Sequence, residues 1–283
     1  MMFRKYFPVY FFAVFMLSVF PGCDIIEPPY TTDHSQDNGN GGEQVRKVLL
    51  EEFTGHHCPN CPEGSAMAKD LQSYYGDRLV IMSIHAGWFA RVTPDAFNYD
   101  FTTPEGDAFY DFFSVSQNPI GMVNRKPYEA SLLLTPSAWA EAIEDIIHQE
   151  PEFHIQIASQ PITGQASFAV DVDVAALINS DETFYLSAFI IEDYIIKPQK
   201  TNNPEYADGV IPDYAHMHVL RKGINGIWGE PLSDGSIHAG EQFLHTYNVS
   251  LDPDWVPEHC SVIAFVYHYP SREIMQVASA PLQ

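Results

Sequence analysis

The sequence predicts an α/β domain at residues 45–150, followed by an all-β domain at residues 151–283. Up to residue 150, buried-strand patterns alternate with apolar residues at helical spacing, as in a sheet covered by helices. After Pro151 the apolar residues recur at every second position, in short runs separated by turn residues, which is typical of strands. A chain of 283 residues, 46% of them hydrophobic, is long enough to bury two such cores.

The N-terminus predicts export. Arg4 and Lys5 precede an apolar run that ends just before Cys23. This is the pattern of a bacterial lipoprotein signal peptide, residues 1–22, and it makes Cys23 the expected lipidation site and membrane anchor. An ordinary signal peptide or an uncleaved anchor is the alternative. Residues 23–44 are rich in Pro, Asn, Gly and Asp, so we expect a lipidated, flexible tether there.

The charge of the chain excludes one class of partner. The sequence has 37 acidic and 14 basic residues, a net charge of −23. Such a surface repels phosphate backbones, so no nucleic acid is expected to bind. The lipoprotein signal predicts a lipid-anchored protein of the bacterial envelope, facing the periplasm or the surface.

The elements of the α/β domain follow from local patterns. Residues 48–53 and 79–85 are apolar on both faces, as central parallel strands are. A helix is predicted from the C-x-x-C segment to about Tyr75, and a short one at residues 105–113. A hairpin of residues 120–124 and 130–134 follows, then a helix capped by Thr135, opened by Pro136 and ending near Gln149. The order β-α-β-α-β-β-α, with C-x-x-C at the first strand-to-helix junction, is that of a thioredoxin-like core. For the all-β domain, the runs that include residues 184–196 and 216–224 predict an immunoglobulin-like or jelly-roll sandwich.

The segment VLLEEFTGHHCPNCPEG, residues 48–64, holds the predicted redox site. A thiolate at Cys58, where the helix begins, would be favoured by free N–H groups and by protonated His57 or its neighbour His56. We expect Cys58 to be the exposed nucleophile and Cys61, one helical turn on, to resolve the mixed disulfide. Glu52 lies on an otherwise apolar strand, so its carboxyl should be buried with a raised pKa and could take a proton from Cys61.

A proline completes the predicted catalytic set. Pro119 begins a strand after Asn118, and in a thioredoxin-like fold that position carries a cis-proline facing the C-x-x-C segment. Asn118 and Ile120 would offer backbone groups to an extended peptide. His57, Pro59, Asn60 and Trp88 complete the expected substrate-binding residues. Trp88 lies in an aromatic insert with Phe89, Phe97, Tyr99 and Phe101, which forms either a groove wall or a satellite core.

The motifs carry a family resemblance. The C-P-x-C form resembles bacterial disulfide oxidoreductases and glutaredoxins, in which an acidic residue precedes the first cysteine by six positions, as Glu52 does. His57 stands where thioredoxin has tryptophan, which suggests a more oxidising couple. The whole layout, from Cys23 through residues 48–64 to HMHVLRKGINGIWGEP, resembles the outer-membrane-protein-28-related lipoproteins of Bacteroidetes-type bacteria. That resemblance implies the fold and a lipid anchor in the outer membrane, and no specific activity.

Other interpretations of the same residues remain open at this stage. Cys58 and Cys61 could form a passive structural disulfide, or bind copper or zinc together with His56, His57 and His85. His216 and His218 would share one strand face, as a zinc pair or a surface stripe. Cys260 opens an apolar run and is expected to be a buried, inert thiol.

The sequence therefore predicts an envelope thiol–disulfide oxidoreductase with no cofactor and no metal. Its partners would be thiol- or disulfide-containing envelope proteins. The alternative is a surface binding or adhesion lipoprotein, in which the β domain binds a protein or glycan and the first domain is a scaffold.

Overall fold

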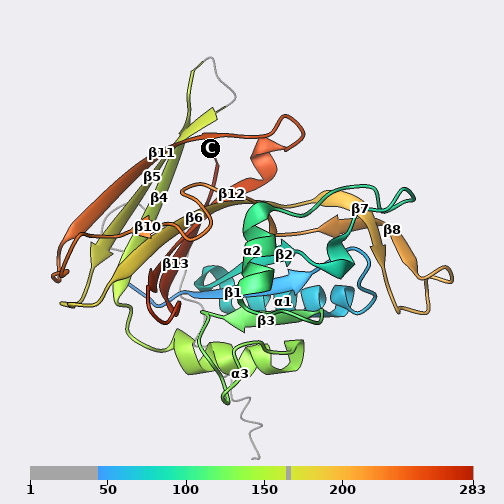
Figure 1. Cartoon of the computed structure of the whole chain (residues 1–283), viewed down its shortest axis with the longest axis horizontal. Helices are drawn as coiled ribbons and strands as arrows, with labels where there is room; N and C mark the ends of the chain where they lie inside the picture. Colours follow the sequence, from blue (N-terminus) through green and yellow to red (C-terminus); the bar gives the residue numbers. More distant parts are fainter. Residues whose placement is uncertain (1–43, 164–166, 283) are drawn as a thin grey trace, which may run out of the picture. The chain divides into compact units, whose positions relative to one another are not determined.

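Three α-helices and three strands organise the first half of the chain (Figure 1). The computed structural model describes residues 44–163 and 167–282, so the predicted signal peptide, most of the tether and Cys23 lie outside the described residues. This half contains β1 (Val48–Thr54), α1 (Cys61–Tyr75), η1 (Gly76–Arg78), β2 (Leu79–His85), η2 (Trp88–Ala90), α2 (Pro104–Phe112), β3 (Ile120–Val123) and α3 (Pro136–Ile147).

Strand β1 is central, and every one of its residues is buried. It pairs in parallel with β2, from Val48 opposite Leu79 to Thr54 opposite His85, and antiparallel with β3. On one face its apolar side chains pack against α1 and α3, where Trp139 and Ile143 are fully buried. On the other face they meet α2 and strands from the second half of the chain. Burial on both faces explains the unbroken apolar run that predicted a central strand.

Two local predictions for this half are wrong in detail. Helix α1 begins at Cys61, so Cys58 lies in the preceding loop. The expected hairpin strand at residues 130–134 is reduced to isolated bridges, of which Leu134 to Gly121 extends the sheet.

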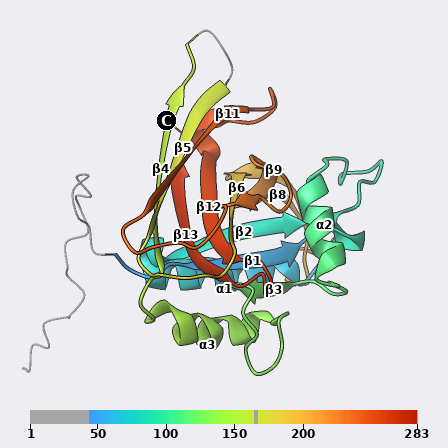
Figure 2. The same cartoon turned by 60° about the vertical axis from the view of Figure 1, so that its left-hand side comes forward.

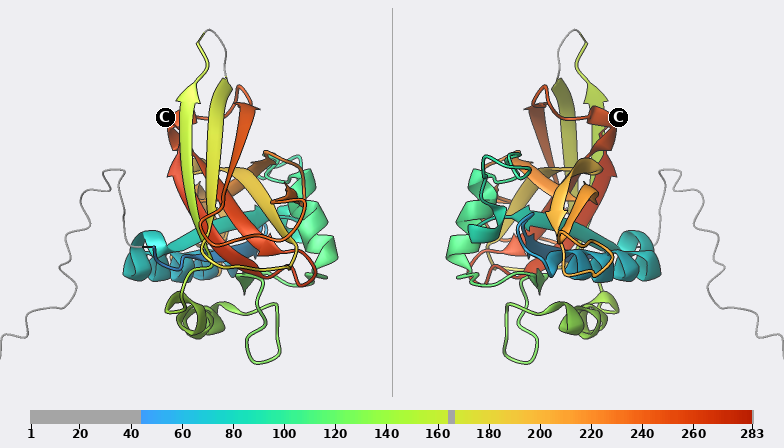
Figure 3. Two further views of the ribbon diagram at one scale, coloured as in Figure 1. Left: turned by 90° about the vertical axis from the view of Figure 1, so that its left-hand side faces the viewer. Right: turned by 90° about the vertical axis from the view of Figure 1, so that its right-hand side faces the viewer.

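The second half is built of strands. They are β4 (Phe153–Pro161), β5 (Ser167–Ala176), β6 (Phe184–Glu192), β7 (Ile195–Lys200), β8 (Val210–His216), β9 (Val219–Gly223), β10 (Glu230–Pro231), β11 (Gln242–Ser250), β12 (Cys260–His268) and β13 (Ile274–Pro281), with η3 (Pro257–His259) before β12. A three-stranded sheet, β11-β5-β4, stands against β6, β12 and β13 (Figure 3). Alternating side chains of β5 and β6 fill the space between them, as period-two patterning predicts.

Two long strands predicted here are each divided. Residues 184–196 form β6 and β7 with a turn at Tyr194, whose φ is 60°. Residues 216–224 do not form one strand either, because β8 ends at His216 and the chain turns at His218, with φ of 55°, before β9. His216 and His218 therefore do not share a strand face.

One sheet crosses the predicted boundary at residue 150. Its order is β13-β12-β6-β9-β2-β1-β3, with β10 beside β6, and Ser83 of β2 lies opposite Val219 of β9 (Figure 2). The described residues belong to one compact unit. Hydrophobic side chains of β1 and β2, among them Phe53 and Met82, share a core with Phe189 of β6 and Phe265 of β12.

Candidate functional site

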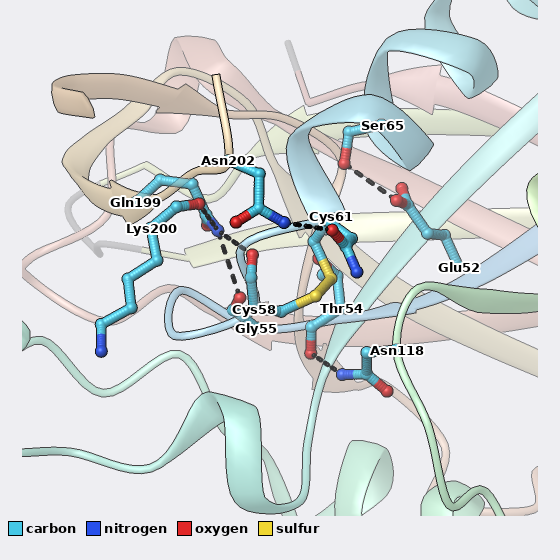
Figure 4. The surroundings of a disulfide bond; sticks show 11 residues. Glu52, Thr54, Gly55, Cys58, Cys61, Ser65, Asn118, Gln199, Lys200 and Asn202 are labelled. Atoms are coloured by element: carbon cyan, nitrogen blue, oxygen red, sulfur yellow. Dashed lines mark hydrogen bonds between the residues drawn. A yellow bond between two sulfur atoms is a disulfide. The ribbon is translucent and has the colours of Figure 1, made fainter. Parts of the chain in front are cut away.

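Cys58 and Cys61 form a disulfide between the end of β1 and the start of α1 (Figure 4). Their Cα atoms are 5.4 Å apart. The Cys58 N–H donates to the carbonyl of Gly55 at 2.9 Å, and the Cys61 N–H donates to the carbonyl of Cys58 at 3.3 Å. This tight loop holds the two sulfurs together and leads directly into the helix.

The hairpin β7–β8 and the residues after β7 cover this loop. The Lys200 N–H donates to the His56 carbonyl at 2.9 Å, and the Asn202 N–H donates to the Pro59 carbonyl at 3.1 Å. Gln199 Nε2 donates to the Cys58 carbonyl at 2.9 Å, and Asn202 Nδ2 donates to Asn60 Oδ1 at 2.5 Å. Figure 4 shows the side-chain contacts of Gln199 and Asn202. The two backbone contacts resemble the pairing with which an extended peptide joins a sheet edge.

The cover changes the expected role of Cys58. Its side chain is only 1% exposed, so the prediction of an exposed nucleophile is wrong. The physical reason is tertiary: residues 199–202 occupy the side of the loop that the local motif alone would leave open to solvent. Pro59 and Asn60, predicted to bind substrate, contact Asn202 in this structure.

Glu52 behaves as its position predicts. It is 1% exposed, Ser65 Oγ donates to its Oε1 at 2.8 Å, and Ser83 Oγ donates to its Oε2 at 3.3 Å. Burial raises the pKa of Glu52 to about 7, although the hydrogen bonds from Ser65 and Ser83 lower it in part. Near pH 7 this carboxyl can therefore both accept and release a proton.

The Asn118–Pro119 peptide bond is cis, as predicted. Pro119 packs against α1 at Gly64, where an added Cβ would lie 2.8 Å from Pro119 Cβ. Asn118 Nδ2 donates to the Thr54 carbonyl at 2.9 Å, and Ile120 is buried opposite Phe53. These residues fasten the end of β1 beside the disulfide. Their presentation of a peptide stays a prediction.

The two histidines before Cys58 are neutral at pH 7. Burial lowers the pKa of His56, and burial with neighbouring positive groups lowers the pKa of His57 to about 4. His56 Nε2 is 2.9 Å from the Arg91 carbonyl, and His57 Nε2 is 3.3 Å from Thr93 Oγ1. The prediction that a protonated histidine stabilises the Cys58 thiolate is therefore wrong at neutral pH.

The aromatic insert is mostly buried. Phe97 and Phe101 are 5% and 1% exposed, and Phe101 packs with Ile195 and Val219 as a small satellite core. Trp88 is 69% exposed, with the Arg91 guanidinium 4.0 Å from its ring centroid.

A cavity of about 660 Å³ adjoins the disulfide on its Cys61 side. Polar members of its lining include Glu52, Cys61, Ser65, His85, Tyr214 and His216. Both ring nitrogens of His85 and Nε2 of His216 are buried without a hydrogen-bond partner among the described residues. Burial lowers the pKa of both rings, that of His216 to about 3, so both are neutral. The sequence singled out His85 and His216 without bringing them together, and no pattern in it pointed to Tyr214 or Gln199.

The metal and zinc-pair interpretations find no support in this geometry. Within residues 44–163 and 167–282, no group of three or more His, Cys, Asp or Glu is placed to hold a metal ion. His216 is buried, whereas His218 pairs its Nδ1 with Asp193 Oδ1 at 3.2 Å. Cys260 is buried as expected, and burial raises the pKa of its thiol to about 12.

Comparison with solved structures finds one with a similar fold and one partial match. HBP35 of Porphyromonas gingivalis covers 86% of this chain and 77% of its own, with a TM-score of 0.61 and 19% identity. A domain of the outer membrane lipoprotein Omp28 from the same organism covers 47% of this chain and 89% of its own, with a TM-score of 0.32 and 21% identity. No curated protein matches the chain.

The family model described as outer membrane protein Omp28 matches residues 106–283, more than half of the chain. None of the described helices is long and apolar enough to cross a membrane. The family match confirms the resemblance seen in the sequence and the predicted location at the outer membrane. The chain belongs to the Omp28 family of outer membrane proteins.

Proposed function

We propose that this protein is an envelope lipoprotein that carries out thiol–disulfide exchange through the Cys58–Cys61 disulfide. The observation that carries the proposal is Glu52, a buried carboxyl that lines the same cavity as Cys61 and is held by two serine hydroxyls. Burying an acid costs free energy, and at this position it supplies a proton acceptor and donor to the cavity that Cys61 also lines.

The surrounding elements support a thioredoxin-like unit at residues 45–150. Strand β1 lies between parallel β2 and antiparallel β3, and α1 follows the disulfide loop directly. The cis Asn118–Pro119 bond and the packing of Pro119 on α1 agree with the same proposal. Each exchange event is an attack by a thiolate on one sulfur of the disulfide, with loss of the other sulfur as a thiolate.

The reduction potential of the Cys58–Cys61 pair tests the proposal. The mature chain carrying Cys260→Ser, which removes the buried third thiol, is equilibrated with glutathione buffers and the reduced fraction is measured by alkylation and mass spectrometry. We expect a potential of roughly −270 to −120 mV, the range of working exchange proteins. A potential well below about −300 mV would mean a structural disulfide. The binding or adhesion alternative would then be preferred.

A further inference from the structure

We infer that the substrates of this disulfide are small polar thiols, which enter the cavity beside α1 and attack the sulfur of Cys61. This inference rests on the proposed exchange function and names its substrate class. It also makes Cys61 the reactive cysteine, whereas the sequence predicted Cys58.

Both cysteines are 1% exposed, and it is the cavity that distinguishes them. Cys58 is held under residues 199–202 by the hydrogen bonds described above, and it does not line the cavity. Cys61 does line the cavity, whose rim includes the exposed residues Ala66, Lys69 and Tyr194. A cavity of about 660 Å³ admits a small molecule, whereas a folded protein cannot enter it.

The direction of approach also favours Cys61. A thiolate attacks a disulfide sulfur from the side opposite the sulfur that leaves. Because Cys61 lines the cavity and Cys58 does not, we expect a thiol in the cavity to meet Cys61 first, with Cys58 as the leaving group.

The polar lining indicates what kind of thiol fits. The rings of His85 and His216 lie 5.4 Å apart between centroids, and His85 stacks on Phe101 at 4.5 Å. A neutral imidazole has one donor nitrogen and one acceptor nitrogen. Three of these four ring nitrogens have no partner among the described residues. A thiol that carries a hydroxyl, amine or amide group would bond to them, and a purely apolar thiol would not.

The reaction balances with two thiols. The first thiol transfers its proton to the Glu52 carboxylate and its sulfur bonds to Cys61 Sγ; the Cys58–Cys61 bond breaks, and Cys58 leaves as a thiolate that takes a proton from water. The second thiol loses its proton to water and attacks the substrate sulfur of the mixed disulfide. Cys61 leaves as a thiolate and takes the proton from Glu52. Two small thiols are oxidised to their disulfide, and the protein disulfide is reduced to two thiols.

The test compares the two cysteines one at a time. Full mature chains carrying Cys260→Ser with either Cys58→Ser or Cys61→Ser are mixed with cystamine, and mixed-disulfide formation is followed by mass spectrometry. We expect Cys61 to react at least tenfold faster than Cys58. A faster Cys58 would overturn the inference and leave the proposed exchange function intact, whereas two unreactive cysteines would overturn both.

A second measurement uses the intact disulfide, in case the single-cysteine variants loosen the fold. Ala66→Trp narrows the cavity rim, and the neighbouring Met67→Trp is the matched control, since Met67 is exposed and lies outside the lining. We expect Ala66→Trp to slow reduction by 2-mercaptoethanol at least tenfold and Met67→Trp to change it less than twofold. In the unsubstituted protein, 2-mercaptoethanol should react at least tenfold faster than 1-propanethiol, after correction for their rates with glutathione disulfide. Equal effects of the two tryptophans, or equal rates for the two thiols, would contradict the inference.

Discussion

Adjacent glutamates on β1 have opposite environments. Strand side chains alternate between the two faces of a sheet. Glu51 therefore points away from α1, where Arg125 binds it through two hydrogen bonds of 2.7 and 2.6 Å. The Arg125 guanidinium in turn lies 4.9 Å from the ring centroid of Phe109. Glu52 faces α1 and the cavity, where serine hydroxyls hold it. Of these two neighbouring glutamates, Glu51 therefore forms a structural ion pair, and Glu52 is an acid that titrates near neutral pH.

Glu52→Gln should remove a loss of folding stability that the Glu52 carboxyl causes at high pH. In the unfolded chain the Glu52 carboxyl ionises near pH 4.5, whereas in the folded chain its pKa is about 7. Between these two pH values the folded state keeps the proton and the unfolded state loses it. The free energy of unfolding therefore falls as pH rises through this range. Above pH 7 the total loss from this group is about 3 kcal/mol. Glutamine does not titrate. Urea unfolding should therefore show the variant close to the parent at pH 4 and more stable than the parent at pH 8.

Charged and titratable neighbours of Glu52 are His218 and Tyr214. The matched control is Glu51→Gln, which leaves the buried Arg125 without its partner carboxylate. It should destabilise the fold by about 3–5 kcal/mol at both pH values. A Glu52→Gln variant whose stability difference from the parent is the same at pH 4 and pH 8 would contradict the assigned pKa.

At this scale much of the site could be predicted from sequence. Burial of Glu52 and of Cys260 follows from strand patterns that are local in the chain. The cis bond before Pro119 is expected from the likeness to a thioredoxin fold. The pKa values of His56 and His57 could not be predicted, because the groups that bury them come from the aromatic insert and from β7.

At the scale of elements, the decisive segment is residues 199–202, at the end of β7 and just after it, because it pairs with the C-P-N-C loop. Two of its contacts are made by backbone N–H groups, which any sequence can supply, and two by the side chains of Gln199 and Asn202. The segment joins Cys58 to a residue 141 positions later in the chain. Neither hydrophobic periodicity nor a sequence motif indicates a pairing between such distant residues. The sequence therefore predicted a Cys58 exposed to solvent.

Removing one backbone donor from this segment should open the disulfide to large reductants. Asn202→Pro removes the N–H that donates to Pro59 together with the side-chain bond to Asn60, whereas Asn202→Ala removes only the side-chain bond. With a protein dithiol such as thioredoxin, we expect Asn202→Pro to be reduced at least tenfold faster than Asn202→Ala, which corresponds to about 1.4 kcal/mol.

Small thiols provide the control for this comparison. Asn202 does not line the cavity, so reduction by 2-mercaptoethanol should differ less than threefold between the two variants. If the small and the large reductant were accelerated equally, the segment would not be a selective cover.

Across the whole molecule, one sheet and one shared core join the two halves. The all-β character after residue 151 and the helices before it could be predicted, since each follows a local period. The single bridge between β2 and β9 could not, because it joins residues far apart in the chain and depends on where β8 ends. The predicted division into two domains stays a prediction, which thermal unfolding can test.

Scanning calorimetry of residues 44–283 should show one cooperative transition, with calorimetric and van't Hoff enthalpies in agreement. The reason is the shared core, in which Phe53 and Met82 contact the layer that contains Phe189 and Phe265. A fragment of residues 151–283 would expose that layer and should bind a hydrophobic dye and aggregate. Two separate transitions, or a soluble and cooperatively folded fragment, would show that the halves are independent.

The distance along the chain between the disulfide and its cover also orders events in time. An exported chain emerges N-terminus first, so both thiols reach the envelope before Gln199 has crossed. During that interval the oxidising machinery of the compartment meets an open C-P-N-C loop. Once residues 199–202 pair with the loop, they cover Cys58, and the cavity borders Cys61. Under the proposed exchange function, the two thiols are oxidised before their cover forms, and the completed fold then restricts which thiols can reduce the disulfide.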